Sequence, residues 1–80
     1  MRSTSPMQVA REWYRAHLIV WWAEKIPGTN FWQGNAAISE GYGKLKPNRL
    51  QGPDGRFETE KEARDYIFQA AKEWVDNRFN

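Results

Sequence analysis

The most regular hydrophobic pattern in this chain lies in its last third, where apolar residues recur at intervals of three and four positions. Such spacing is typical of an amphipathic helix. Thr59 is followed three residues later by Glu62, which is the spacing of a capping box at a helix start. We therefore predict a helix from Glu60 to Arg78, about 28 Å long. Its apolar face would consist of Ala63, Tyr66, Ile67, Ala70, Ala71 and Trp74.

Before this helix, the pattern changes to short β-favouring runs separated by turn residues. Residues 13–25 form the first predicted strand, with apolar side chains on both faces. Pro27-Gly28 suits a type II turn, and Gly52–Gly55 suits another tight turn. A third strand is predicted to begin at Arg49. The second predicted strand is residues 31–42, in which apolar residues alternate with polar ones: Trp32, Ala36, Ile38 and Tyr42 against Gln33, Asn35 and Ser39. Gly34 and Gly41 in this strand indicate either bulges or positions where large tryptophan side chains of the neighbouring strand need space.

These elements predict an α+β fold in which a three-stranded antiparallel sheet packs on one long C-terminal helix. Residues 13–80 would form a single domain, and residues 1–12 a flexible or short helical segment. Ser5-Pro6 could cap and open a helix through about Glu12. The same segment is also compatible with an extension of the first strand or with irregular backbone. Because one helix covers one face of a sheet, the other face would be exposed unless a second element covers it.

Composition narrows the classes of function. The 80 residues include five Trp, four Phe and three Tyr but no Cys, which excludes disulfides, thiolate metal sites and a Cys nucleophile. The net charge of +2 is too small to imply a polyanionic partner by itself. The longest apolar run, near Leu18–Ala23, is too short to span a bilayer. We expect a cytoplasmic protein with no membrane association.

The sequence offers little catalytic chemistry. His17 is the single histidine and has no metal-ligating neighbour at a suitable spacing. No Ser lies in a Gly-x-Ser-x-Gly elbow. Gly41-Tyr42-Gly43-Lys44 lacks both the spacing and the following helix of a phosphate-binding loop. We expect no enzymatic activity, cofactor, metal or small-molecule substrate.

Two surfaces are candidates for binding. The first is the sheet face away from the helix, since aromatic rings interleaved with basic side chains suit single-stranded nucleic acid. Alternatively, its tryptophans belong to the core and its basic residues to a solvated edge. The residues of this candidate nucleic-acid surface are Arg15, Trp21, Trp22, Lys44, Lys46, Arg49 and Arg56.

The second candidate is a stripe on the helix that consists of Phe68, Val75 and Phe79. These residues lie to one side of the main apolar face and could pack on another protein or on a second copy of this chain. Alternatively, Phe68 and Val75 widen the contact of the helix with the sheet, and Phe79 lies at a frayed end.

Several short segments carry a resemblance to known proteins. They are Tyr14-Arg15-Ala16-His17, the Pro27-Gly28 turn, Phe31-Trp32, the capped helix start from Gly55 to Ala63, and Trp74-Val75-Asp76. Over residues 14–78 the chain resembles families of small bacterial proteins that have a curved antiparallel sheet, one long C-terminal helix and no established activity. The resemblance implies a fold and no catalytic residue.

A weaker resemblance is to double-stranded RNA-binding domains, which also run helix, three strands, helix. In that family the first turn of the last helix is rich in lysine and binds the phosphates of the RNA. Here residues 58–64 contain Glu58, Glu60 and Glu62 against Lys61 and Arg64, so this stretch departs from the family's pattern.

Together these observations predict a non-catalytic binding or interaction module. A protein partner or a weak homodimer is the first expectation. The alternative is single-stranded nucleic acid bound on the open sheet face. Binding through phosphates would weaken steeply with salt, whereas an apolar protein interface would not.

Overall fold

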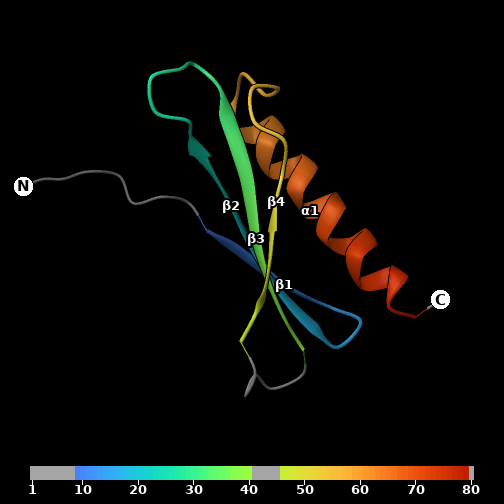
Figure 1. The fold of residues 1–80 in the computed structure, drawn as a ribbon. Helices are drawn as coiled ribbons and strands as arrows, with labels where there is room; N and C mark the ends of the chain where they lie inside the picture. Colours follow the sequence, from blue (N-terminus) through green and yellow to red (C-terminus); the bar gives the residue numbers. More distant parts are fainter. Residues whose placement is uncertain (1–8, 41–45, 80) are drawn as a thin grey trace, which may run out of the picture.

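A computed structural model of the chain describes residues 9–40 and 46–79. In this part of the chain, four strands form one antiparallel sheet in the order β1-β2-β3-β4, and a single helix follows them. The helix crosses one face of the sheet (Figure 1). The α+β class is thus confirmed, but the sheet has four strands and not three. The elements are β1 (Ala10–Tyr14), β2 (His17–Lys25), β3 (Trp32–Glu40), β4 (Asn48–Gln51) and α1 (Glu60–Asn77).

The additional strand is β1, at the N-terminal edge of the sheet. The predicted first strand, residues 13–25, is divided by a two-residue turn at Arg15 and Ala16, which have φ angles of 51° and 65°. Positive φ at both central residues is the geometry of a type I′ hairpin turn, which usually contains Asn and Gly. Since Arg-Ala gives no such sequence signal, the hairpin was missed. Residues 10–12, for which a short helix was one expectation, belong to β1 and pair with β2.

The other predicted turns and strands agree with the structure within a few residues. Gly28 has a φ of 78°, and the Thr29 amide donates to the Ile26 carbonyl over 3.1 Å, as in a type II turn. Gly55 also has a positive φ, 75°. Strand β3 pairs with both β2 and β4. Gly41 and Tyr42, which were expected to extend β3, lie outside the described residues.

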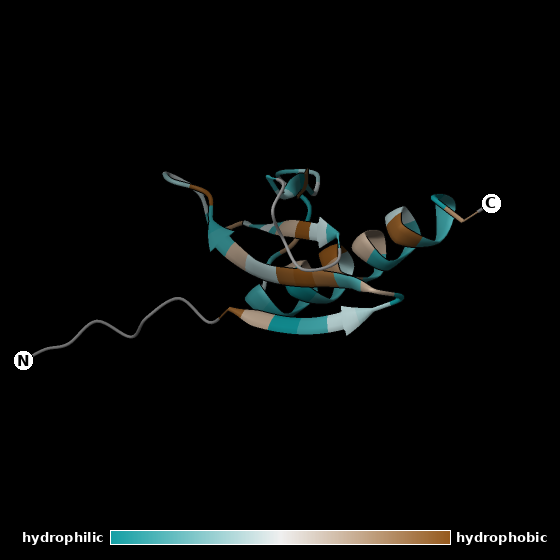
Figure 2. Ribbon diagram, turned by 90° about the horizontal axis from the view of Figure 1, so that it is seen from below, coloured by the Kyte–Doolittle hydropathy of each residue, from teal (hydrophilic) through white to brown (hydrophobic). Residues whose placement is uncertain are grey.

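The core lies between α1 and the face of the sheet that it covers. Ile19, Ala36 and Ile38 of the sheet pack with the buried side of the helix, which consists of Ala63, Ile67, Ala71 and Val75. In Figure 2, brown hydrophobic segments appear in both layers, and the turns of the helix alternate brown with teal. The buried side of the helix differs slightly from the predicted apolar face. Val75 is fully buried, whereas Tyr66 is 40% exposed and Trp74 half-buried.

The helix approaches β3 most closely at Gly34. A Cβ atom on Gly34 would lie 2.5 Å from the Ala63 carbonyl oxygen and 2.6 Å from the Ile67 Cβ. Both are shorter than van der Waals contact, so any side chain at this position would push the helix off the sheet. The room that Gly34 provides is for the helix backbone, and not for a tryptophan of the neighbouring strand.

The helix begins as predicted. The Thr59 hydroxyl oxygen accepts a hydrogen bond from the Glu62 amide over 3.1 Å. Thr59 has extended backbone geometry, with φ −131° and ψ 154°, which is typical of an N-cap residue. The Glu62 carboxylate accepts from the Thr59 hydroxyl, also over 3.1 Å. In a full capping box the Glu62 carboxylate would accept from the Thr59 backbone amide, whereas here it accepts from the Thr59 hydroxyl, so the structure shows the Thr59 half of the predicted capping box.

We predict that Gly34→Ala lowers the free energy of unfolding by about 1–3 kcal/mol, because the added methyl group has no space between β3 and α1. Thermal unfolding would measure the loss. Gly52→Ala is the matched control, since its Cβ would meet the Tyr66 ring at an ordinary 3.4 Å. Equal melting temperatures for the two variants would contradict the close approach.

We also predict that Thr59→Ala costs about 1 kcal/mol, because the Glu62 amide loses its acceptor. Thr59→Ser keeps the hydroxyl and should unfold close to the wild-type midpoint in urea. If the serine variant were as unstable as the alanine variant, the effect would not come from the cap.

Candidate binding surface on the open sheet face

Strand pairing divides the sheet side chains between two faces. One face carries Ile19, Ala36 and Ile38 and is covered by α1. Side chains of the opposite parity point to the other face, which no described helix or strand covers (Figure 1). We call this surface the open face. Its residues are Arg11 and Trp13 of β1, Leu18, Val20, Trp22 and Glu24 of β2, Gln33, Asn35, Ala37 and Ser39 of β3, and Arg49 and Gln51 of β4.

An apolar strip runs over the middle of the open face. It consists of Trp13, Leu18, Val20, Trp22 and Ala37. Trp13 is 53% exposed, and the other four residues are half-buried. A contiguous group of accessible apolar side chains that is rimmed by polar residues is one of the features that mark binding surfaces.

Arginines flank the strip on both edge strands. The register places Arg11, Val20, Ala37 and Arg49 in one row across the four strands. The Cα atoms of the two arginines are thus separated by three strand spacings, or about 14 Å. Within residues 9–40 and 46–79, neither guanidinium forms an ion pair. Both charges are available to a partner.

An amide cluster, Gln33, Asn35 and Gln51, lies beside Trp22. The Asn35 amide donates to the Glu24 carboxylate over 3.2 Å, and the Gln33 amide donates to the Gly52 carbonyl over 2.9 Å. The Gln51 amide is 3.4 Å from both other side chains of the cluster. Asn35 also donates to the Gln33 carbonyl over 3.3 Å, so both amide hydrogens of Asn35 and both of Gln51 are used within these contacts. The cluster therefore offers mainly amide oxygens, which accept hydrogen bonds, on the open face.

The predicted nucleic-acid surface is only partly assembled. Of its described members, Trp22 and Arg49 lie on the open face. Trp21 points to the helix side, where its ring stacks on Phe68 at a centroid distance of 4.0 Å. Arg15 is in the β1–β2 turn.

Two further described members of that predicted surface lie outside the strands. Lys46 is exposed ahead of β4, and Arg56 lies over the Phe57 ring in the segment that leads to α1. Lys44 is outside the described residues. Arg11 and Trp13 were not predicted as site residues. In an extended chain Val9, Arg11 and Trp13 would lie on one side, and this alternation could have indicated a strand over these residues. The position of Pro6 favoured the start of a helix instead.

The predicted helix stripe is not a continuous surface. Val75 is fully buried and cannot contact a partner, and Phe68 is half-buried between Trp21 and the Lys72 ammonium group. Phe79 is 53% exposed, with the Arg15 guanidinium 4.3 Å from its ring centre. Phe68 and Val75 therefore widen the contact between helix and sheet, which was the alternative interpretation of the stripe.

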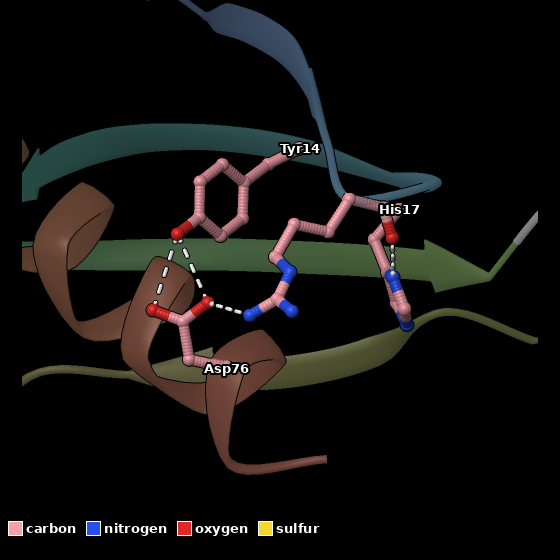
Figure 3. A network of polar contacts seen from close by, with 4 residues as sticks. Tyr14, His17 and Asp76 are labelled. Atoms are coloured by element: carbon pink, nitrogen blue, oxygen red, sulfur yellow. Dashed lines mark hydrogen bonds and ion pairs between the residues drawn. The ribbon is translucent and has the colours of Figure 1, made fainter. Parts of the chain in front are cut away.

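A polar cluster ties the C-terminal end of α1 to the β1–β2 turn (Figure 3). The Tyr14 hydroxyl donates to the Asp76 carboxylate, at 2.9 and 3.1 Å from its two oxygens, and the Arg15 guanidinium donates over 2.8 Å. The Arg15 and Tyr14 hydrogen bonds lower the pKa of Asp76, and the bond to Asp76 raises the pKa of Tyr14. His17 is 7% exposed, with Nδ1 2.8 Å from the Arg15 carbonyl. We interpret this cluster as a structural clamp.

Other kinds of site have less support in the described part of the chain. No group of three or more His, Asp or Glu side chains there could hold a metal ion. The pockets beside the β2–β3 loop are shallow and are lined by Lys25 at the end of β2, by loop residues 26–31 and by Glu58. Among the described residues, no helix is both long and apolar enough to cross a membrane.

Comparisons with protein-family models, with curated proteins and with solved structures found no match to this chain. The two resemblances inferred from the sequence therefore stay predictions. A functional interpretation has to be built on the open face itself.

We predict that Asp76→Asn lowers the melting temperature at neutral pH, because the charge that Arg15 and Tyr14 contact is removed. The pKa of Asp76 is lower in the folded state than its unfolded value of 3.8, so the ionised carboxylate stabilises the fold at pH values above 3.8. This stabilisation is lost as the pH falls through the folded-state pKa. The difference from wild type should therefore shrink under acid conditions.

The control is Asp65→Asn, which removes the same charge from α1 at the exposed ion pair with Lys61. It should change the melting temperature little at any pH. A difference between Asp76→Asn and wild type that stayed constant from neutral to acid pH would argue against the clamp.

Proposed function

We propose that this protein is a non-catalytic binding module whose partner docks on the open face of the sheet. The observation that carries this proposal is the apolar strip between two arginines that form no ion pair with any described residue, on a face that no described element covers. Burying the strip against a partner would release water from apolar surface. The arginines would fix the position of a partner that carries negative charge.

The rest of the fold supports this assignment by making the surface rigid. Helix α1 packs on the back of the sheet, is capped at Thr59 and is clamped at Asp76. Side chains on strands that are braced in this way are held in place more firmly than side chains on loops. A preformed surface loses less conformational entropy on binding.

A non-catalytic role agrees with the position of the single histidine. His17 is packed in the clamp next to the Phe79 ring, with its Nδ1 in contact with the Arg15 carbonyl. It lies on the helix side of the sheet, since it pairs with Tyr14. It is thus separated from the open face by the sheet itself.

The proposal can be tested by photo-crosslinking in the organism of origin. A photoreactive phenylalanine analogue at position 13 replaces an exposed Trp on the open face, and the same residue at Gln69 probes the exposed side of α1. We expect a discrete adduct from position 13 and none from position 69. Equal labelling from both positions, or no adduct from position 13, would count against the open face as the docking surface.

A further inference from the structure

The geometry points to single-stranded nucleic acid as the partner on the open face: Arg11 and Arg49 would contact phosphates, and Trp13 and Trp22 would stack on bases. This inference rests on the proposed function, because it names the partner of the same surface. It is carried by the charges, the aromatic side chains and the amide cluster of that surface.

The charge distribution of the domain favours a polyanion on this side. Glu24 is the only acid among the described residues of the open face, and its carboxylate accepts a hydrogen bond from Asn35. The arginines lie at opposite edges of the same row and have no ion-pair partner within residues 9–40 and 46–79. The acids of α1 belong to the opposite side of the sheet. They are Glu60, Glu62, Asp65, Glu73 and Asp76.

The tryptophans are placed to stack on bases. Trp13 pairs with Leu18 and Trp22 pairs with Asn35, so the two rings lie on either side of the arginine row. They are four residues apart along the strand direction and on adjacent strands, which corresponds to about 14 Å between their Cα atoms. Bases stack on such rings whatever their sequence, and phosphates between two stacked bases would pass near the row of arginines.

The amide cluster adds hydrogen-bonding groups next to one stacking position. Asn35 and Gln51 lie in the same cross-strand row as Trp22. A base stacked on Trp22 would therefore have its edge near two side-chain amides. Unpaired bases are recognised in this way, by stacking on an aromatic ring and hydrogen bonding along an exposed edge.

A second copy of the chain is a poorer occupant. Two open faces packed against each other would be related by a two-fold axis in the plane between them. An axis along the strands would place Arg11 over Arg49 of the other copy, and an axis across the strands would place each arginine over its own equivalent. Both arrangements oppose like charges across an apolar interface, which disfavours them.

The test is a titration with fluorescently labelled RNA and DNA of the same mixed sequence, about 12 nucleotides long. Binding is followed by fluorescence anisotropy between about 50 and 200 mM salt. We expect both single strands to bind more tightly than the matching duplex. Two phosphate contacts predict a slope near −1.4 for log K against log salt concentration.

Matched variants separate phosphate contacts from general charge. Arg11→Gln and Arg49→Gln should each reduce the slope by about 0.7, whereas Lys61→Gln, which removes the same charge from α1, should leave it unchanged. Trp13→Leu should weaken binding about 5- to 150-fold, and Trp22→Leu likewise. Phe79→Leu, at a residue as exposed as Trp13, should have no effect. The melting temperature of each variant is measured to check that it is folded. If Trp22→Leu is unfolded, the stacking prediction is tested with Trp13→Leu alone.

Three results would overturn the inference. They are the absence of binding to either strand at the lowest salt, an equal effect of Lys61→Gln and Arg49→Gln, and equal binding of a labelled poly-glutamate peptide that is insensitive to Trp13→Leu. The photo-crosslink distinguishes the two levels of failure. An open-face adduct whose size is unchanged by nuclease would reject nucleic acid but keep the binding module, whereas no open-face adduct would reject both.

Discussion

The close packing of α1 on β3 is the constraint on which the rest of the structure depends. Gly34 has no side chain, so the helix backbone at Ala63 and the Ile67 side chain lie directly on the strand. Ala36 and Ala71 keep the contact close farther along the helix. Because the two layers are so near each other, small apolar residues can form a dense core in a chain of 80 residues. One face of the sheet carries the core that this contact buries, and no described helix or strand covers the other face.

The clamp at the far end of the helix has a consequence for the open face. Arg15 and Ala16 both adopt left-handed backbone conformations, each of which costs about 1–2 kcal/mol for a residue other than glycine. The contacts of Tyr14 and Arg15 with Asp76 offset part of this cost. They thereby hold the hairpin that brings β1 into the sheet. The position of Arg11 and Trp13 on one face depends on a carboxylate that lies on the other.

Local sequence patterns were sufficient to predict the fold class, the helix, its cap and three of the strands. Each has a strong short-range signal, such as the Thr59 capping spacing or the Pro27-Gly28 turn. The β1–β2 turn has none, since Arg-Ala is an unusual pair for positive φ and is stabilised by Asp76, which is distant in the sequence. Tertiary contacts therefore decided the one element that was missed.

The same reason explains why the candidate binding surface could be predicted only in part. Alternation along β2 separates Trp21 from Trp22, but the sequence does not say which of them faces the helix, because both faces of that strand are apolar. Register with β3 and the burial of Ile19 settle the question: Trp21 packs on Phe68, and Trp22 is left on the open face. A surface made of alternate residues from four strands exists only once every register is fixed. Its arginine row, built from the two outermost strands, could not be recognised until β1 was known to be a strand.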